Sequence, residues 1–324
     1  MTLPHHNLPV PISRNSGKPA RPRFGKIANW QLAMENAFSL VEIMVVVSLL
    51  SLIVLALMAV FSSTQRAFRA AVTQTDVLEG SRAAAELMAA DLRGLTPSDG
   101  VSNYVNYGAV NFFTLANSTY YSPLVQSLPG SAVTRTNLLN YFFVLGRDNT
   151  KWTSTAYIVD TSSANPLYPL YRFYAETNTI NSPWTLYSLF VNQIQLPQWS
   201  TNSAFFSHLL DGVVHLTVHA YDTNGTWINN DGVYAYTHAQ NTTFVYPPTF
   251  GSGYGEPQFY MYSNAVPAAV EFEMGVLEDR ALARAQSLPF QSAAQTSYLA
   301  QQAGVVHVFR QRVSIPNVDP SAYQ

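Results

Sequence analysis

The side chain with the clearest chemical potential is Glu42, which stands directly before a long apolar run. No ionisable residue occurs from Ile43 to Phe61. A carboxylate beside such a run is costly to remove from water, so it either extends to a membrane interface or pairs with a positive charge. The second role would make Glu42 a functional residue.

Histidines are the next candidates for chemistry. His215 and His219 fall on one face of a predicted strand, and His208, His238 and His307 could join them. Zinc needs three or four converging ligands, and no short spacing of these histidines indicates such a set. We therefore expect them to occupy polar surface positions, with no metal.

A cluster of oxygen-bearing side chains raises the question of calcium. It consists of Asp222, Asn224, Asn229, Asn230 and Asp231. The cluster lacks the spacing of an EF-hand loop and a late bidentate glutamate, and two successive turns explain it. The Asn-Gly pair within residues 222–227 predicts a hairpin turn, and no metal or cofactor is expected.

Catalytic motifs are not evident in the chain. No G-x-S-x-G sequence occurs, and the glycines of 251–255 lack the preceding strand and following helix of a dinucleotide site. We expect a protein that is not an enzyme.

Seven tyrosines in loop-like sequence are open to two interpretations, a contact surface or ordinary packing: Tyr104, Tyr107, Tyr120, Tyr121, Tyr254, Tyr260 and Tyr262.

Composition and charge indicate a chain that crosses a membrane. Charged residues make up 11%, and the net charge of −2 gives no indication of nucleic-acid binding. The first 37 residues nevertheless carry five basic residues and one acid, which predicts a cytoplasmic N-terminus. The run 43–61 is about as long as a bilayer-spanning helix and exceeds the apolar core of a secretory signal peptide. Without cysteine, disulfides give no information about the compartment.

The segment AFSLVEIMVVVSLLSLIVL, residues 37–55, resembles the class III signal of type IV prepilins and type II secretion pseudopilins. The resemblance implies that a prepilin peptidase cuts between Ala37 and Phe38 and methylates the new amine of Phe38. Glu42 then matches the family's carboxylate at the fifth mature residue. The departure is Ala37, where glycine is commoner, and it predicts slower cutting. The implied partners are other pilin or pseudopilin subunits and an inner-membrane assembly platform.

Charge balance agrees with this resemblance. Cutting would create an ammonium group at Phe38, four residues before Glu42, in a medium where an unpaired charge costs several kcal/mol. In helices stacked with an axial stagger, the carboxylate of one subunit can meet the amine of its neighbour. We therefore expect Glu42 to set the register of assembly.

The helix is predicted to continue beyond the membrane to Arg93. Residues 62–93 contain no proline and are rich in good helix formers, although Gly80 weakens the middle, and Gly94 with Pro97 gives a stop. About 55 residues would extend about 80 Å. The expected organisation is a removable leader at 1–37, a helix at 38–93 with its membrane part at 38–61, and a head at 95–324.

The fold class expected is α+β, with the long transmembrane helix packed on an antiparallel, β-rich, pilin-like head. Residues 278–303 are expected to be helical with a break at Pro289, and 241–257 to be a long exposed loop. In the strand 212–221, alternation predicts that Val214, Leu216, Val218 and Ala220 face the core. The predicted strands are Val110–Ala116, Leu139–Leu145, Thr155–Asp160, Leu170–Ala175, Thr185–Val191, Gly212–Tyr221, Ala268–Val276 and Val305–Ile315.

Two stretches of the head, 209–222 and 266–270, resemble J-type pseudopilins and PilW-type minor pilins. The function expected is therefore a minor pilin or pseudopilin, held in the inner membrane by one span, with its head in the periplasm or outside the cell. A head of about 230 residues favours a low-copy or tip position. Two alternatives are a surface adhesin whose prepilin-like anchor is incidental and an envelope enzyme on a signal anchor.

Overall fold

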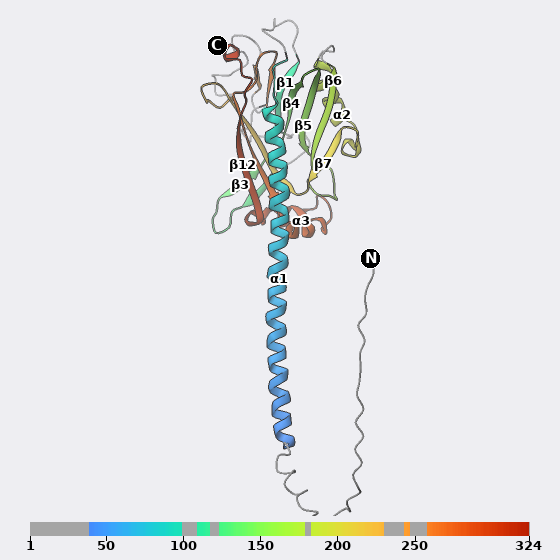
Figure 1. Cartoon of the computed structure of the whole chain (residues 1–324), viewed down its shortest axis with the longest axis vertical. Coiled ribbons are helices and arrows are strands. Elements are labelled where there is room, and N and C mark those ends of the chain that lie inside the picture. The colour runs from blue at the N-terminus through green and yellow to red at the C-terminus, as the bar shows by residue number, and fades with distance from the viewer. Residues whose placement is uncertain are drawn as a thin grey trace, which may run out of the picture. The chain divides into compact units, whose positions relative to one another are not determined.

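The computed structural model describes residues 39–98, 109–116, 123–178, 183–229, 243–246 and 258–323. The chain divides into two compact units, Met1–Thr64 and Gln65–Gln324. In the first unit, the described residues form the N-terminal part of helix α1. In the second, the rest of α1 is part of a head that contains three sheets (Figure 1).

Helix α1 runs from Leu40 to Arg93 and contains 54 residues. Its stretch Leu40–Arg69 is long and apolar enough to cross a membrane, and none of its most apolar part is buried by the chain. The helix ends where the sequence predicts, with the Gly94 N–H donating to the carbonyl oxygens of Ala90 and Asp91. The prediction of one long apolar N-terminal helix is confirmed.

The head combines a seven-stranded sheet, a three-stranded sheet and a two-stranded hairpin, all with antiparallel pairing between their strands. The large sheet has the order β7-β6-β5-β4-β1-β10-β9, the small sheet β12-β11-β8, and the hairpin β2-β3. The strands are β1 Val110–Ala116, β2 Leu124–Ser127, β3 Thr134–Asn137, β4 Asn140–Asp148, β5 Lys151–Val159, β6 Leu170–Asn178, β7 Phe206–Leu210, β8 Val213–Tyr221, β9 Thr243–Tyr246, β10 Gln258–Tyr262, β11 Ala269–Leu277 and β12 Val306–Ser314.

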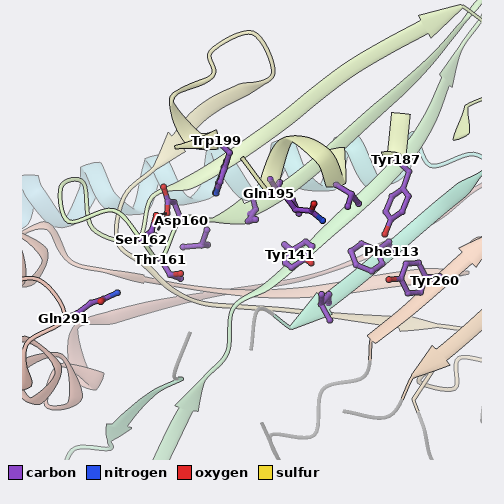
Figure 2. Close-up of a pocket in the computed structure, with 15 residues that line it drawn as sticks. Phe113, Tyr141, Asp160, Thr161, Ser162, Tyr187, Gln195, Trp199, Tyr260 and Gln291 are labelled. Atoms are coloured by element: carbon purple, nitrogen blue, oxygen red, sulfur yellow. Dashed lines mark hydrogen bonds between the residues drawn. The ribbon is translucent and has the colours of Figure 1, made fainter. Parts of the chain in front are cut away.

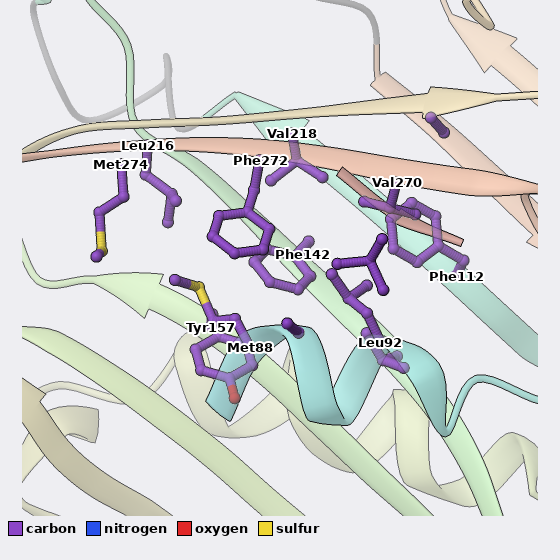
Figure 3. Packing of buried hydrophobic residues seen from close by; sticks show 14 of the residues in the cluster. Met88, Leu92, Phe112, Phe142, Tyr157, Leu216, Val218, Val270, Phe272 and Met274 are labelled. Carbon is purple, nitrogen blue, oxygen red and sulfur yellow. The ribbon is translucent and has the colours of Figure 1, made fainter. Parts of the chain in front are cut away.

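The main core joins three elements: the C-terminal part of α1, the inner face of the large sheet and one face of the small sheet. Figure 3 shows Met88 and Leu92 of α1 together with Phe142 and Tyr157 of the large sheet and Phe272 of the small sheet. All five side chains are fully buried. Burial of this apolar face stabilises the helix in the head.

Two further apolar clusters lie outside the main core. Helix α2, Trp184–Ile194, buries Leu186 and Phe190 with Phe143 and Phe173 of the large sheet. Helices α3, Asp279–Gln286, and α4, Ala293–Ala300, form a cluster that includes Val214 of β8. The remaining elements are short 3₁₀ helices: η1 Trp199–Thr201, η2 Ala303–Val305 and η3 Pro320–Tyr323.

Seven of the eight predicted strands are confirmed as strands, but the prediction of a strand at Thr185–Val191 is wrong. This segment belongs to α2, because Leu186 and Phe190, four residues apart, face the sheet together. The predicted helical region 278–303 contains α3 and α4 with a break at Pro289. The loop expected at 241–257 contains strand β9, and its other residues lie outside the described ranges.

Strand β8 departs from simple alternation at its first residues. Leu216, Val218 and Ala220 belong to the main core as predicted, whereas Val214 packs with α3 and α4 and Val213 takes its place in the core. The cause is a register shift opposite β11, where Gly275 pairs with His215 but Val276 pairs with Val213. An extra residue in a strand reverses the faces of the residues before it.

Candidate functional site

The first turn of α1 contains a reciprocal capping arrangement between Ser39 and Glu42. The Ser39 hydroxyl accepts a hydrogen bond from the Glu42 backbone N–H at 3.1 Å, and Glu42 Oε2 accepts one from the Ser39 N–H, also at 3.1 Å. This is the capping box, in which two backbone donors at a helix start are satisfied by side chains three residues apart. The sequence S-x-x-E is typical of this motif, although the capping box was not predicted from it.

The capping box gives Glu42 a structural role that does not require a second subunit. The Ser39 hydroxyl also donates to Oε2, at 3.4 Å, so the described contacts of this carboxylate converge on one oxygen and leave Oε1 available to another donor. Ala37 and Phe38 lie outside the described residues. Cutting at that bond and pairing of Glu42 with a neighbour's amine remain predictions.

The apolar part of α1 satisfies its hydroxyl groups internally. The hydroxyls of Ser48 and Ser51 donate to the carbonyl oxygens of Val45 and Val47, at 2.8 and 2.7 Å. Such bonds leave no hydroxyl donor exposed to hydrocarbon. The side chains along this stretch, including Leu50 and Phe61, are exposed in the isolated chain and suit lipid or other helices.

The opposite end of α1 is tied to the large sheet by an ion pair. Arg172 of β6 donates to both oxygens of Asp91, from Nε to Oδ2 at 2.7 Å and from Nη2 to Oδ1 at 2.9 Å. The Tyr157 hydroxyl of β5 donates to the same carboxylate. Burial raises the pKa of Tyr157, and the adjacent Asp91 charge raises it further, so the phenol stays protonated as a donor.

This three-residue contact was not predicted from the sequence. Asp91 lies in the last turn of its helix, where a negative charge is unfavourable next to the helix dipole. An acid at such a position indicates a cationic partner, but nothing local identifies Arg172, which is 81 residues away. The side chains of Arg172 and Asp91 are only 20% and 13% exposed, so the bidentate pair is largely desolvated.

The prediction that the histidines occupy polar surface positions is wrong for His215. Its ring is buried beneath the β2-β3 hairpin, where Nδ1 accepts from the Leu138 N–H at 3.2 Å. Burial, together with the nearby charges of Arg135 and His219, lowers the pKa of His215 to about 3. Glu273 pairs with Arg135 at 3.0 Å and lies 3.6 Å from His215 Nε2.

The other described histidines have separate partners and do not converge. His208 contacts Asp211 at 2.7 Å, His307 contacts Glu278 at 3.0 Å, and the His219 ring lies 4.9 Å from that of Trp227. His238 lies outside the described residues. Within the described ranges, no group of three or more potential His, Asp or Glu ligands could hold a metal ion.

The predicted hairpin turn after β8 is confirmed. Asp222 Oδ1 accepts hydrogen bonds from the N–H groups of Asn224 and Thr226, at 2.9 and 2.7 Å, and Gly225 has a φ of 79°. The carboxylate thus holds a turn, as the alternative to calcium binding predicts. Asn230 and Asp231 lie outside the described residues.

Five of the seven tyrosines that the sequence places in loops also lie outside the described residues. The other two, Tyr260 and Tyr262, lie in strand β10 and not in a loop.

Comparisons with protein-family models, with curated proteins and with solved structures found no match. Function is therefore inferred from the residues and contacts of this chain.

Proposed function

We propose that this protein is a minor pilin or pseudopilin subunit of a type II secretion or type IV pilus-like filament. A prepilin peptidase cuts between Ala37 and Phe38, and the mature subunit enters the filament through α1. The observation that carries the proposal is the position of Glu42. Ser39 holds this carboxylate in the first turn of an apolar helix, and a basic leader precedes that helix.

The two parts of α1 suit this role in different ways. The part to Phe61 has exposed apolar side chains that suit a bilayer and, after assembly, the helices of other subunits. The part from Val77 to Leu92 contributes buried residues to the head. A head of this size favours a low-copy or tip position, and its role is assembly, not catalysis.

The proposal places one span in the inner membrane. The excess of basic residues before the span favours a cytoplasmic leader, and the head would then lie in the periplasm or outside the cell. Its partners would be prepilin peptidase, the inner-membrane assembly platform and other pilin-like subunits.

Processing is the direct test. The full chain is coexpressed with a prepilin peptidase or with its inactive variant, and the N-terminus of the purified protein is determined by mass spectrometry. We expect an N-methylated Phe38 only with the active peptidase. A protein that keeps Met1 in the presence of a peptidase active on a control prepilin would contradict the proposal.

A further inference from the structure

A cavity of about 780 Å³ lies on the outer side of the large sheet. Strands β1, β4 and β10 contribute to one wall, and α2 contributes Tyr187, Val191 and Ile194 to the other. These three residues follow one helical stripe, adjacent to the stripe of Leu186 and Phe190 that packs on the sheet. The volume falls within the usual range of small-molecule sites.

One end of the cavity is aromatic. Phe113 contacts Tyr141, Tyr187 and Tyr260, with ring centroids 5.6, 5.6 and 4.5 Å apart. The three tyrosines are half-buried, whereas Phe113 is fixed beneath them in the apolar cluster under α2. Tilted and edge-to-face packing holds these rings in place, so they form a rigid apolar surface.

The other end is polar, and Figure 2 shows it on the far side of the cavity from Phe113 and Tyr260. Its centre is Asp160, which is 5% exposed. Asp160 Oδ1 accepts from the N–H and hydroxyl of Ser162, at 2.8 and 2.6 Å, and Oδ2 accepts from the Ser200 hydroxyl at 2.7 Å. A carboxylate has about four acceptor positions, so Asp160 is held in place with capacity for one more donor.

The charge of the lining restricts what the cavity can bind. Among its described lining residues there is no lysine, arginine or histidine, and Asp160 is the single carboxylate. An anion would meet a buried negative charge without a counter-ion. A cation is not required, because three hydrogen bonds already stabilise the carboxylate. The remaining polar groups are neutral, and Thr161, Gln195 and Gln291 supply hydroxyl and amide groups.

We infer that this cavity binds a neutral saccharide. A sugar ring presents apolar C–H faces, which can lie on fixed aromatic rings, and hydroxyl donors, which suit Asp160 and the neighbouring side-chain oxygens. Phe113 aligns through Phe143 with Ala156, four residues before Asp160, so the two ends are separated by about 13 Å along the strands. This length accommodates more than one ring. The inference is independent of processing at Phe38.

The test uses the full chain in a detergent without a sugar head group. Calorimetric titrations are made with neutral hexaoses of α-1,4-glucose, β-1,4-glucose and β-1,4-N-acetylglucosamine, with an oligogalacturonate as the anionic arm and with choline as the cationic arm. We expect saturable binding of at least one neutral hexaose and none of the charged compounds. Absence of binding by all three neutral hexaoses at millimolar concentration, or equal binding of a charged compound, would overturn the inference.

Variants locate the site. Gln195→Ala alters an exposed residue and Trp199→Leu removes an aromatic ring of the lining; each should weaken binding about tenfold. Trp184→Leu removes an exposed tryptophan of α2 that does not line the cavity, and it should leave the affinity unchanged. Circular dichroism checks folding. If Gln195→Ala binds as tightly as the wild type, and a folded Trp199→Leu does so too, the site lies elsewhere and the inference fails.

Discussion

The two ends of α1 hold their carboxylates in contrasting ways. Glu42 is bound by Ser39, three residues away, and is followed by side chains that the chain leaves exposed. Asp91 is bound by Tyr157 and Arg172, which lie 66 and 81 residues further along. The contact of Glu42 with Ser39 is within one helical turn, so it does not depend on the head, and it leaves one carboxylate oxygen available. The contact of Asp91 joins α1 to the sheet and uses both carboxylate oxygens. The same kind of side chain thus contributes to the fold of the head at one end, and under the proposed function it would contact another subunit at the other.

The largest effect on stability is expected from the removal of the Asp91 carboxylate. Asp91→Ala leaves Arg172 and Tyr157 without their shared partner in a largely buried site, so the free energy of unfolding should fall by about 3–5 kcal/mol. Urea denaturation followed by tyrosine and tryptophan fluorescence measures the change.

The matched control lies in the same helix. Arg82 and Glu86 form a pair whose side chains are 80% and 69% exposed. We expect Arg82→Ala to change the free energy of unfolding by less than about 0.5 kcal/mol. Equal decreases in the free energy of unfolding for Arg82→Ala and Asp91→Ala would show that the burial of the ion pair does not determine its contribution, contrary to our interpretation.

A second test makes one substitution in both halves of α1. Leu92 is fully buried between the sheets, and Leu92→Ala should cost about 2–5 kcal/mol. Leu57 is 63% exposed, so Leu57→Ala should leave unfolding of the head unchanged. Both are measured by urea denaturation in the same detergent. A large loss in Leu57→Ala would mean that the apolar half also stabilises the head.

A test with acid concerns the head, where His215 is buried. His215 has a pKa of about 3 in the folded protein and an ordinary value when unfolded, so the unfolded chain binds more protons between these values. Stability is therefore lost as the pH falls below about 6.5, and this residue should contribute about 2 kcal/mol of loss between pH 7 and pH 5.

The measurement is the difference between the wild type and His215→Asn, whose side chain offers an acceptor to the Leu138 N–H without titrating. Urea denaturation at the two pH values should show a smaller acid loss in the variant. An identical loss would mean that His215 binds protons equally in the folded and unfolded states, so that burial does not lower its pKa.

The last test concerns the N-terminal end of α1, where loss of the cap should destabilise the helix by about 1 kcal/mol and where capping and charge can be separated. Glu42→Gln keeps a capping acceptor but removes the charge, whereas Ser39→Ala removes the cap and keeps the charge. If Glu42 pairs with a neighbour's amine, Glu42→Gln should be processed but fail to copurify with other pilin-like subunits, and Ser39→Ala should copurify. The reverse result would assign Glu42 to capping alone.

The elements that were predicted from the sequence depend on local signals. The apolar run and the Gly94 stop defined α1, and seven strands were visible from their apolar residues. The capping box was also local and could have been found from Ser39 and Glu42. By contrast, β3 has the sequence TRTN and no apolar alternation, so its strand depends on pairing with β2.

Other features were beyond local reasoning because distant residues create them. The sequence of α2 predicts a strand, because a short apolar segment fits the period of a strand as well as that of a helix until its packing surface is known. The surroundings of His215 include Leu138, which is 77 residues away in the sequence, and Glu273 of β11, and the Asp91 contact depends on two neighbouring strands. The aromatic cavity likewise combines β1, β4, β10 and α2.

The position of the Asp91 contact has a mechanical consequence. Tension applied along the C-terminal part of α1 passes through the guanidinium fork of Arg172 into β6, which is bonded to β5 on one side and to β7 on the other. The ion pair thus adds a polar connection to the sheet beside the apolar packing of Met88 and Leu92 in the core. If α1 were pulled, as the proposed function requires, part of the force would reach three hydrogen-bonded strands of the head through this one ion pair.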